Sequence, residues 1–360
     1  MRDKTFLIMA GGTGGHVFPA LAVAYSLMAH HDKVVWLGSK GGMEEGIVTK
    51  ENIPFFGIAV KGLRGKGYLN QVVAPFKIIS AVFQALSILK KVKPDAVLGM
   101  GGFASGPGGV AARILGIPLV IHEQNSVAGM TNKILARFAT TIMTAFPNAF
   151  PEKVVCNVVG NPLRVDITRL YFDRDINKNK QSSMHLLILG GSLGAQSLNE
   201  LVPKALSLLD AEVRPSVWHQ TGKNKAEAVS QLYREFKIEV KVSEFIENMA
   251  EAYKWADFVI CRSGALTISE LCAAGLGAIL IPYPYAVDDH QTKNAEYIVK
   301  GGAGWLLAQN DLTPKILSEV LQPLLVKRER VNILSEAAYK LAQIDATERV
   351  ANECRRVSYA

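Results

Sequence analysis

The chain has 360 residues, of which 49% are hydrophobic and 20% are charged, and it carries a net charge of +8 with a pI near 9.2. This length is large for one hydrophobic core, so we expect two domains. The excess of basic residues predicts an anionic partner, either a phosphorylated small molecule or an anionic membrane surface. Nucleic acid is not predicted, because the chain has neither zinc-finger spacing nor an aromatic-basic platform.

The cysteines and the N-terminal residues indicate the compartment. Cys156, Cys261, Cys272 and Cys354 are scattered and form no CxxC pair, so neither a disulfide framework nor a structural zinc site is predicted. The first apolar run breaks at Gly11, too early for a signal peptide. No apolar run reaches about 18 residues, so no transmembrane helix is predicted. We expect a cytoplasmic protein, in contact with a membrane at most from that side.

In the first half of the chain, short apolar runs alternate with helical patterns. Residues 5–10 form such a run, followed by the glycine-rich turn at 11–15 and a helical pattern over 17–29. Each later run is bounded by Gly, Pro or a polar turn, as expected for a parallel sheet. These further strands are predicted at residues 34–37, 96–98, 119–121 and 141–143.

The second half repeats this organisation after a polar connection at residues 173–183. An apolar run at 185–189 leads into a second glycine-rich turn at 190–195. Asp345 and Glu348 have the spacing of a capping box, which predicts a last helix that ends near Val357. The repetition predicts two α/β domains that face each other across a cleft. The other strands expected here are residues 217–219, 240–242, 258–261 and 278–281.

Both glycine turns have the character of a phosphate site. Glycine lets main-chain N–H groups approach a ligand, and the N-terminus of the following helix adds partial positive charge. A dinucleotide is not favoured, because the third glycine of a G-x-G-x-x-G fingerprint is replaced by Val17. The second strand is followed by Gly38 and Ser39 instead of the acid that holds a ribose. An NAD-linked oxidoreductase is therefore a weakened alternative.

His16 is the first candidate for chemistry. It lies in the first turn of a helix, where the helix dipole favours the neutral imidazole that can accept a proton. This arrangement suits a general base acting on a sugar hydroxyl. The alternative is a histidine that only makes hydrogen bonds at the start of the helix.

Two further loops of the first half carry candidate ligand contacts. The glycine cluster at residues 99–109 predicts close approach of the main chain to a bulky ligand. His122, Glu123, Gln124 and Asn125 follow a predicted strand, at the sheet edge where open α/β sheets bind ligands. The alternative for these polar residues is a cluster that caps the next helix.

In the second half, the loop that begins at Arg262 leads into a helix that carries Glu270. A carboxylate at this place can accept hydrogen bonds from a ribose diol. The alternative is a capping box with Thr267. Asp288, Asp289 and His290 resemble metal ligands, but no second cluster accompanies them, and no metal site is predicted.

A long apolar stretch with lysines around it runs from Val72 to Lys93. Its apolar residues recur at helical spacing, and such a helix can lie in the headgroup layer of an anionic membrane. The alternative is a buried core helix with a basic, solvated end.

Taken together, these segments resemble the MurG family of bacterial UDP-N-acetylglucosamine:lipid I N-acetylglucosaminyltransferases. The resemblance rests on motifs that run in order along nearly the whole chain. They are GGTGGH (11–16), GLRGKG (62–67), GMGGFASGPGG (99–109), HEQN (122–125), GNPLR (160–164), GGSLGAQ (190–196), EFIENM (244–249), CRSGALTISE (261–270) and DATERVANE (345–353).

The resemblance implies a GT-B fold of two Rossmann-like domains with parallel sheets facing across a cleft. Residues 1–162 would form the acceptor- and membrane-facing domain and residues 163–342 the domain that binds UDP-N-acetylglucosamine. Residues 343–360 would form a helix that returns to the first domain.

The implied activity is an inverting transfer of N-acetylglucosamine from UDP to the 4-hydroxyl of undecaprenyl-diphosphate-linked N-acetylmuramoyl-pentapeptide. This step converts lipid I to lipid II in peptidoglycan synthesis, which serves cell shape and division. The enzyme would act as a peripheral protein on the cytoplasmic side of the inner membrane, without cofactor or metal, and its partners would include cell-wall and division proteins. The alternatives are a UDP-N-acetylglucosamine 2-epimerase of the same fold and a non-catalytic sensor of nucleotide sugars.

The resemblance also implies roles for individual residues. His16 would be the base, with Glu123 as the other candidate. The acceptor's diphosphate would meet Gly102, Ser105 and Gly106. Related sequences often have two glutamines where this chain has His290 and Gln291, so only Gln291 is assigned to the sugar. The donor-binding residues would be Thr13, Gly14, Gly15, Asn125, Arg164, Ser192, Ile246, Ala265, Leu266, Thr267, Ile268, Ser269, Glu270 and Gln291.

Overall fold

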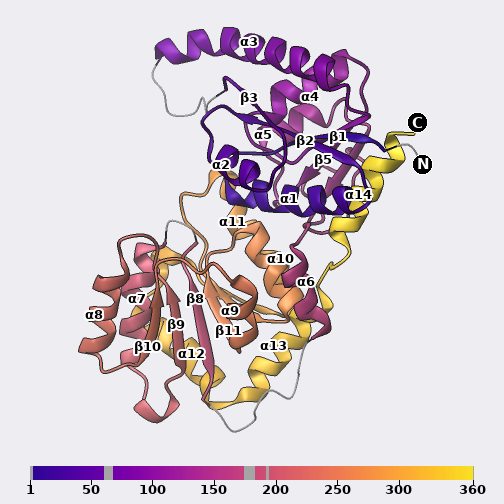
Figure 1. The fold of residues 1–360 in the computed structure, drawn as a ribbon. Coiled ribbons are helices and arrows are strands. Elements are labelled where there is room, and N and C mark those ends of the chain that lie inside the picture. The colour runs from indigo at the N-terminus through magenta and orange to yellow at the C-terminus, as the bar shows by residue number, and fades with distance from the viewer. Residues whose placement is uncertain (1–2, 61–67, 174–182, 192–193, 360) are drawn as a thin grey trace. The chain divides into compact units, whose positions relative to one another are not determined.

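The computed structural model describes residues 3–60, 68–173, 183–191 and 194–359, without the side chains of residues 68–74 and 287. The chain divides into two compact units (Figure 1). One unit is Met1–Arg164 with Ile344–Ala360, and the other is Val165–Gln343. The first unit extends two residues beyond the expected boundary after 162. Leu163 belongs to it because its main-chain N–H and C=O both bond the hydroxyl of Thr347, at 3.1 and 3.0 Å.

The first unit is built on a parallel sheet in the order β3-β2-β1-β4-β5-β6-β7. The central strand β1 (Thr5–Met9) pairs with β2 on one side and β4 on the other. The strand order therefore reverses at β1, and ligands of open α/β sheets bind at such a point. The remaining strands are β2 (Lys33–Ser39), β3 (Phe55–Ile58), β4 (Ala96–Gly99), β5 (Leu119–Glu123), β6 (Thr141–Thr144) and β7 (Asn157–Val158).

Helices pack against both faces of this sheet, and each face has its own apolar cluster. Alternation along β1 sends Phe6 and Ile8 into one cluster and Leu7 and Met9 into the other. The cluster of Leu7 and Met9 includes Leu89 of α3. The helices are α1 (Gly14–Ala29), α2 (Met43–Lys50), α3 (Tyr68–Val92), α4 (Ser105–Ile114), α5 (Met130–Leu135) and α14 (Ala346–Val357).

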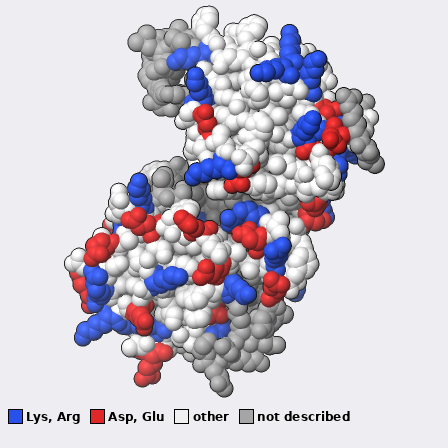
Figure 2. Space-filling model, viewed as in Figure 1, with Lys and Arg blue, Asp and Glu red and all other residues white. Residues whose placement is uncertain are grey.

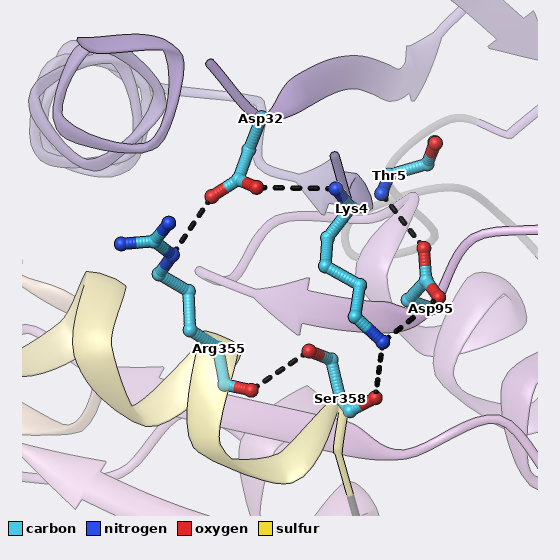
Figure 3. Close-up of polar contacts among 6 residues, drawn as sticks. All are labelled: Lys4, Thr5, Asp32, Asp95, Arg355 and Ser358. Atoms are coloured by element: carbon cyan, nitrogen blue, oxygen red, sulfur yellow. Dashed lines mark hydrogen bonds and ion pairs between the residues drawn. The ribbon is translucent and has the colours of Figure 1, made fainter. Parts of the chain in front are cut away.

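The last helix, α14, packs on the first unit, whose first residues lie almost a whole chain length away (Figure 1). Lys4 Nζ donates to the carbonyl of Ser358 at 2.8 Å and pairs with Asp95 at 3.3 Å (Figure 3). Arg355 Nε lies 2.9 Å from Asp32, whose side chain is 3% exposed (Figure 3). Together with the buried apolar side of α14, these contacts join the end of the chain to β1.

The helix was expected, but its predicted capping box is wrong. The carboxylate of Asp345 pairs with Arg349 at 2.6 Å instead of capping the helix. Glu348 accepts a hydrogen bond from Ser26 on α1 at 2.8 Å. The two acidic side chains are thus used in packing α14, and a spacing rule does not distinguish this use from capping.

The second unit has the same plan, with strand order β10-β9-β8-β11-β12-β13 and all pairs parallel. Its order reverses at β8 (His185–Leu189), the strand that precedes the second glycine turn. The other strands are β9 (Ser216–Gln220), β10 (Val240–Ser243), β11 (Phe258–Cys261), β12 (Gly277–Leu280) and β13 (Gly304–Leu306). The helices are α6 (Val165–Phe172), α7 (Gln196–Ser207), α8 (Ala226–Glu235), α9 (Met249–Trp255), α10 (Ala265–Ala274), α11 (His290–Lys300), α12 (Pro314–Val326) and α13 (Arg328–Lys340).

Candidate functional site

The first glycine turn carries His16 in a defined orientation. The turn connects β1 to α1, and Gly12 has a φ of +84°, which favours glycine. His16 Nδ1 lies 3.2 Å from the carbonyl oxygen of Gly11 and 3.3 Å from the hydroxyl of Thr13. A carbonyl only accepts hydrogen bonds, so the neutral ring bonded to Gly11 carries its hydrogen on Nδ1. The lone pair that can accept a proton is then on Nε2.

The loop after β4 lies directly against this histidine. A Cβ atom on Gly101 would lie 2.8 Å from Cδ2 and 3.0 Å from Nε2 of His16. A Cβ atom on Gly102 would lie 2.5 Å from the carbonyl oxygen of Gly11. Both glycines have a positive φ, +94° and +90°. The imidazole of His16 is therefore positioned by the main chain of the loops that follow β1 and β4, two neighbouring strands.

The rest of the glycine cluster has mixed roles. A Cβ atom on Gly108 would overlap the sulfur of Met9, and one on Gly109 would lie 2.6 Å from Leu135. These two glycines allow close packing, so the prediction that the whole cluster approaches a ligand is wrong for them. Gly106 differs, because the nearest atom to its Cβ position is 3.6 Å away, on Thr131.

Ser105, a predicted contact of the acceptor's diphosphate, begins α4 and is fully buried. Its hydroxyl lies 3.0 Å from the carbonyl oxygen of Met9 and 2.7 Å from that of Gly101, and donates toward them. The side chain thus holds the glycine loop against β1. Any contact of Ser105 with a diphosphate would come from its main-chain N–H.

The end of β5 carries Glu123, which is 3% exposed. One carboxylate oxygen accepts from the N–H of Gly129 at 3.0 Å and from the amide of Asn132 at 2.9 Å. The other accepts from the N–H of Asn125 at 3.0 Å and from its side-chain amide at 3.3 Å. These hydrogen bonds occupy lone pairs of the carboxylate oxygens. Glu123 is therefore built to shape the loop that carries Asn125.

His122 is fully buried, and its Nε2 lies 2.9 Å from the carbonyl oxygen of Gly160. Its Nδ1 lies 3.1 Å from the amide nitrogen of Gln124. Burial lowers the pKa of His122 to about 4, so the ring is neutral at physiological pH. It joins β5 to the segment that ends in Arg164, whose guanidinium lies 6.0 Å from the ring of Phe18.

The second glycine turn, between β8 and α7, is packed against main chain. Gly191 and Gly194 have φ values of +80° and +69°, and the N–H of Gly194 donates to the carbonyl of Gly191 at 2.9 Å. A Cβ atom on Gly194 would overlap the carbonyl oxygen of Thr221. The predicted donor contact at Ser192 lies outside the described residues.

Buried polar side chains hold Thr221 in this position. Asn199 donates to the carbonyl of Thr221 at 3.0 Å, and its own carbonyl lies 3.1 Å from His219 Nε2. His219 Nδ1 lies 3.0 Å from the hydroxyl of Tyr233. Burial lowers the pKa of His219 to about 3, so this chain of hydrogen bonds contains a neutral imidazole.

Helix α10 carries the predicted donor residues from Ala265 to Glu270. It begins after Gly264 and ends at Gly275, whose φ is +61°. Glu270 is 7% exposed and accepts a hydrogen bond from the hydroxyl of Tyr253 at 2.9 Å. Thr267 lies inside the helix, so the alternative of a capping box formed with Glu270 is excluded. The N-terminus of a helix attracts an anion through its N–H groups and its dipole.

Two further predicted donor contacts lie near α10 in the sequence. Ile246, between β10 and α9, has a buried side chain, which leaves the predicted contact to its main chain. Gln291, in the first turn of α11, accepts from the N–H of Tyr283 at 2.9 Å through its side-chain carbonyl. Because the side-chain oxygen is used in this bond, a contact of Gln291 with a ligand would come from its amide N–H donors.

The sequence analysis missed three groups that support the site. Glu44 lies beneath the first glycine turn, Tyr253 donates to Glu270, and Asn199 with His219 supports the second turn. The sequence signal that could have identified Glu44 is an acidic residue that follows soon after the second strand. The other two groups are single polar residues in apolar segments and carry no local signal. Among the described residues, no group of three or more potential metal ligands occurs.

Two family descriptions match the chain, one for each unit. The glycosyltransferase family 28 N-terminal domain matches residues 6–144, and the C-terminal domain of the same family matches residues 185–350. Together they cover most of both sheets.

Curated relatives are similar over the full length. A protein of Cellvibrio japonicus is 51% identical, covering 100% of both chains. A protein of Marinobacter nauticus is 49% identical, covering 98% of this chain and 97% of its own. Both are named UDP-N-acetylglucosamine–N-acetylmuramyl-(pentapeptide) pyrophosphoryl-undecaprenol N-acetylglucosamine transferase.

Solved structures share the architecture. MurG of Acinetobacter baumannii is 42% identical and covers 98% of this chain and 99% of its own, with a TM-score of 0.86. A UDP-N-acetylglucosamine 2-epimerase is 14% identical over 98% of this chain and 95% of its own, with a TM-score of 0.69. The second likeness shows the fold alone.

Proposed function

The chain belongs to the MurG group of glycosyltransferase family 28, and we infer from this that it transfers N-acetylglucosamine from UDP to the lipid-linked N-acetylmuramoyl-pentapeptide. It has the GT-B fold of two parallel-sheet α/β units. It is a UDP-N-acetylglucosamine-dependent N-acetylglucosaminyltransferase that makes lipid II, the precursor of peptidoglycan. The single observation that carries this conclusion is full-length identity near 50% to relatives that bear this name.

The 2-epimerase alternative is not favoured. Only 14% identity connects the chain to that enzyme, which is enough for a shared fold and not for a shared reaction. An epimerase turns over UDP-N-acetylglucosamine alone, whereas a transferase requires the acceptor.

We propose His16 as the base that activates the acceptor. The 4-hydroxyl oxygen attacks C1 of N-acetylglucosamine on the face opposite to UDP, and its proton passes to Nε2 of His16. The bond from C1 to the β-phosphate oxygen breaks, and its electron pair leaves with UDP. The tautomer fixed by Gly11 supports this role, because it leaves the lone pair on Nε2. The four hydrogen bonds that Glu123 accepts make that carboxylate the weaker candidate.

We propose that the second unit holds the donor. Glu270 would accept from the ribose hydroxyls, the main chain at Ile246 would contact the uracil, and Gln291 would donate to the sugar. The N-terminus of α10, from Ala265 to Thr267, would stabilise the charge that develops on the departing diphosphate. Arg164, which ends the first segment of the first unit, is proposed as a further contact of the diphosphate. Stabilisation by N–H groups and a helix dipole is the reason to expect transfer without a metal or cofactor.

The first unit would hold the acceptor and part of the sugar. The turn from Thr13 to Gly15 and Asn125 would contact N-acetylglucosamine. The acceptor's diphosphate would meet the N–H groups of Gly102, Ser105 and Gly106. The space at the Cβ position of Gly106 supports this placement.

We propose that α3 attaches the protein to the inner membrane from the cytoplasmic side. Among its described side chains, Phe76 is 71% exposed, Phe83 is 67% exposed and Ile79 is 53% exposed, while Leu89 is buried. Figure 2 shows a broad uncharged surface on the same unit, with basic side chains at its margins. Both predicted alternatives for this stretch thus have support, since one side of α3 is core and the other is apolar and exposed. The side chain of Val72 and the GLRGKG motif lie outside what is described. No described helix is both long and apolar enough to cross a bilayer.

The transfer is tested with radiolabelled UDP-N-acetylglucosamine and a short-chain analogue of the lipid acceptor, with magnesium or with EDTA. We expect acceptor-dependent labelled product under both conditions. Label released or isomerised without acceptor would contradict the transferase function. Loss of product in EDTA would contradict only the metal-free mechanism.

Attachment to the membrane is tested by sedimentation with vesicles that contain anionic lipid. We expect binding that weakens when Phe76 and Phe83 are replaced by serine, because both side chains are exposed and apolar. Replacing Val155, which is 88% exposed and lies outside α3, by serine is the matched control. Equal binding of all three proteins would exclude α3 as the attachment site.

A further inference from the structure

A buried carboxylate lies beneath the turn that carries the proposed base. Glu44 is the second residue of α2, and its side chain is 1% exposed. One of its oxygens accepts from the N–H of Gly12 at 3.2 Å, and the other accepts from the N–H of Ser39 at 2.8 Å. Glu44 thus connects the end of β2 to the first glycine turn.

The main chain around this carboxylate leaves no room for other side chains. A Cβ atom on Gly11 would overlap Oε1 of Glu44, and one on Gly42 would lie 2.6 Å from the carboxylate. A glycine turn after a strand normally offers its N–H groups to an anion that comes from outside. Here the carboxylate of Glu44 takes the N–H of Gly12 and places its own acidic group at the turn.

The position of Gly11 determines the position of the imidazole. His16 Nδ1 is bonded to the carbonyl of Gly11, and the same carbonyl abuts Gly102. A group that fixes Gly11 and Gly12 therefore also fixes the direction of His16 Nε2. A misplacement of about 1 Å in such a group can cost on the order of 100-fold in rate.

We infer that Glu44 is a positioning residue for His16, and that its carboxylate excludes phosphate from the first glycine turn. The turn is left to hold the base and uncharged sugar hydroxyls, and the diphosphates bind at other loops. This inference rests on the proposed function, because it assigns Glu44 a task in that reaction.

The test compares two variants in the first turn of α2. In Glu44→Gln, one of the two N–H donors would meet the amide's own N–H, so the turn loses a hydrogen bond and the negative charge. Glu45→Gln is the matched control, because Glu45 also accepts from a main-chain N–H, that of Gly41 at 2.7 Å, away from the His16 turn. We expect kcat to fall about tenfold or more in Glu44→Gln, with KM for UDP-N-acetylglucosamine and Kd for UDP unchanged. Glu45→Gln should match the unsubstituted protein.

A second readout does not depend on turnover. The rate at which diethyl pyrocarbonate modifies His16, followed by mass spectrometry, should change in Glu44→Gln and not in Glu45→Gln. Exposed His30 serves as the internal reference. If the unsubstituted protein fails to transfer sugar, the proposed function fails, while the modification rate still tests whether Glu44 positions His16.

Three outcomes would overturn the inference. An unchanged kcat together with an unchanged modification rate would show that Glu44 does not position the base. A higher KM for the acceptor in Glu44→Gln would show that the carboxylate supports acceptor binding instead of excluding phosphate from the turn. A loss of UDP affinity equal to the loss of kcat would show general damage to the fold. Glu44→Asp keeps the negative charge but shortens the side chain, whereas Glu44→Gln keeps the length and removes the charge. We expect a higher kcat in Glu44→Asp than in Glu44→Gln.

Discussion

The two glycine turns have similar sequences and follow the central strands of two similar sheets, yet they are filled differently. The turn after β1 is closed from beneath by the carboxylate of Glu44. The turn after β8 is packed against the carbonyl of Thr221, which is held by neutral Asn199 and His219. A turn that already contains a carboxylate is a poor phosphate site, whereas one supported by neutral groups keeps its attraction for anions. In our proposal, the same local motif therefore serves a base in one unit and a nucleotide in the other.

The largest expected effect separates catalysis from binding at the first turn. Replacing His16 with alanine should lower kcat by about 10²- to 10⁴-fold, because a general base contributes this much. Binding of UDP, measured by calorimetry, should not change, since Ile246 and Glu270, the residues proposed to hold the uridine, belong to the second unit. His30→Ala is the control for loss of an exposed histidine. An unchanged kcat in His16→Ala would contradict His16 as the base and would favour Glu123 in that role.

An added methyl group at each turn should produce different defects. Gly101→Ala would press on His16, so we expect kcat to fall about tenfold with donor KM unchanged. Gly194→Ala would press on Thr221 at a positive φ, so we expect donor KM to rise and unfolding free energy to fall by about 1–3 kcal/mol. Steady-state kinetics and urea unfolding measure both. Identical defects in the two variants would contradict the division of tasks.

Tyr253 offers a smaller test on the nucleotide side. Tyr253→Phe removes the hydrogen bond to Glu270, which is worth about 1 kcal/mol and therefore about fivefold in donor KM. Competition by UDP and by 2′-deoxy-UDP should become more nearly equal, because Glu270 would then be less well oriented toward the ribose. Tyr297→Phe, which removes a hydroxyl on α11, is the control. A lower kcat with unchanged preference for ribose would argue against the role of Glu270.

The last prediction concerns the dependence of stability on pH. Burial lowers the pKa of His122 to about 4 and that of His219 to about 3, below the 6.5 expected in the unfolded chain. Below pH 6.5 the unfolded state therefore binds more protons, and unfolding free energy falls as pH decreases toward these values. Urea unfolding at pH 7 and pH 4.5 should show this loss, and His219→Gln should reduce its slope. A slope that is the same in His219→Gln would mean that His219 does not contribute to the pH dependence.

Local patterns were enough for much of the fold. The central strands are long apolar runs with glycine turns at their ends, and both sheets follow from that alternation. Strand β3 (Phe55–Ile58) was missed because Phe55 and Phe56 are only partly buried and Gly57 is exposed, which leaves Ile58 as its one buried residue. Strand β13 is a three-residue edge strand that also begins with glycine. An edge strand is defined by its pairing with a neighbouring strand, and its sequence lacks the apolar run that marks a central strand.

The sequence by itself determined the two α/β units, the glycine turns and the candidates His16 and Glu270, because periodicity and motif spacing are local properties. Only the tertiary structure decided which groups act on these residues. Glu44 reaches Gly12 across more than thirty residues, and Tyr253 reaches Glu270 from another helix. It also showed that Gly108 and Gly109 serve packing and that Asp345 does not cap its helix. A side chain's partner depends on which distant segments fold against it, and no local pattern contains that information.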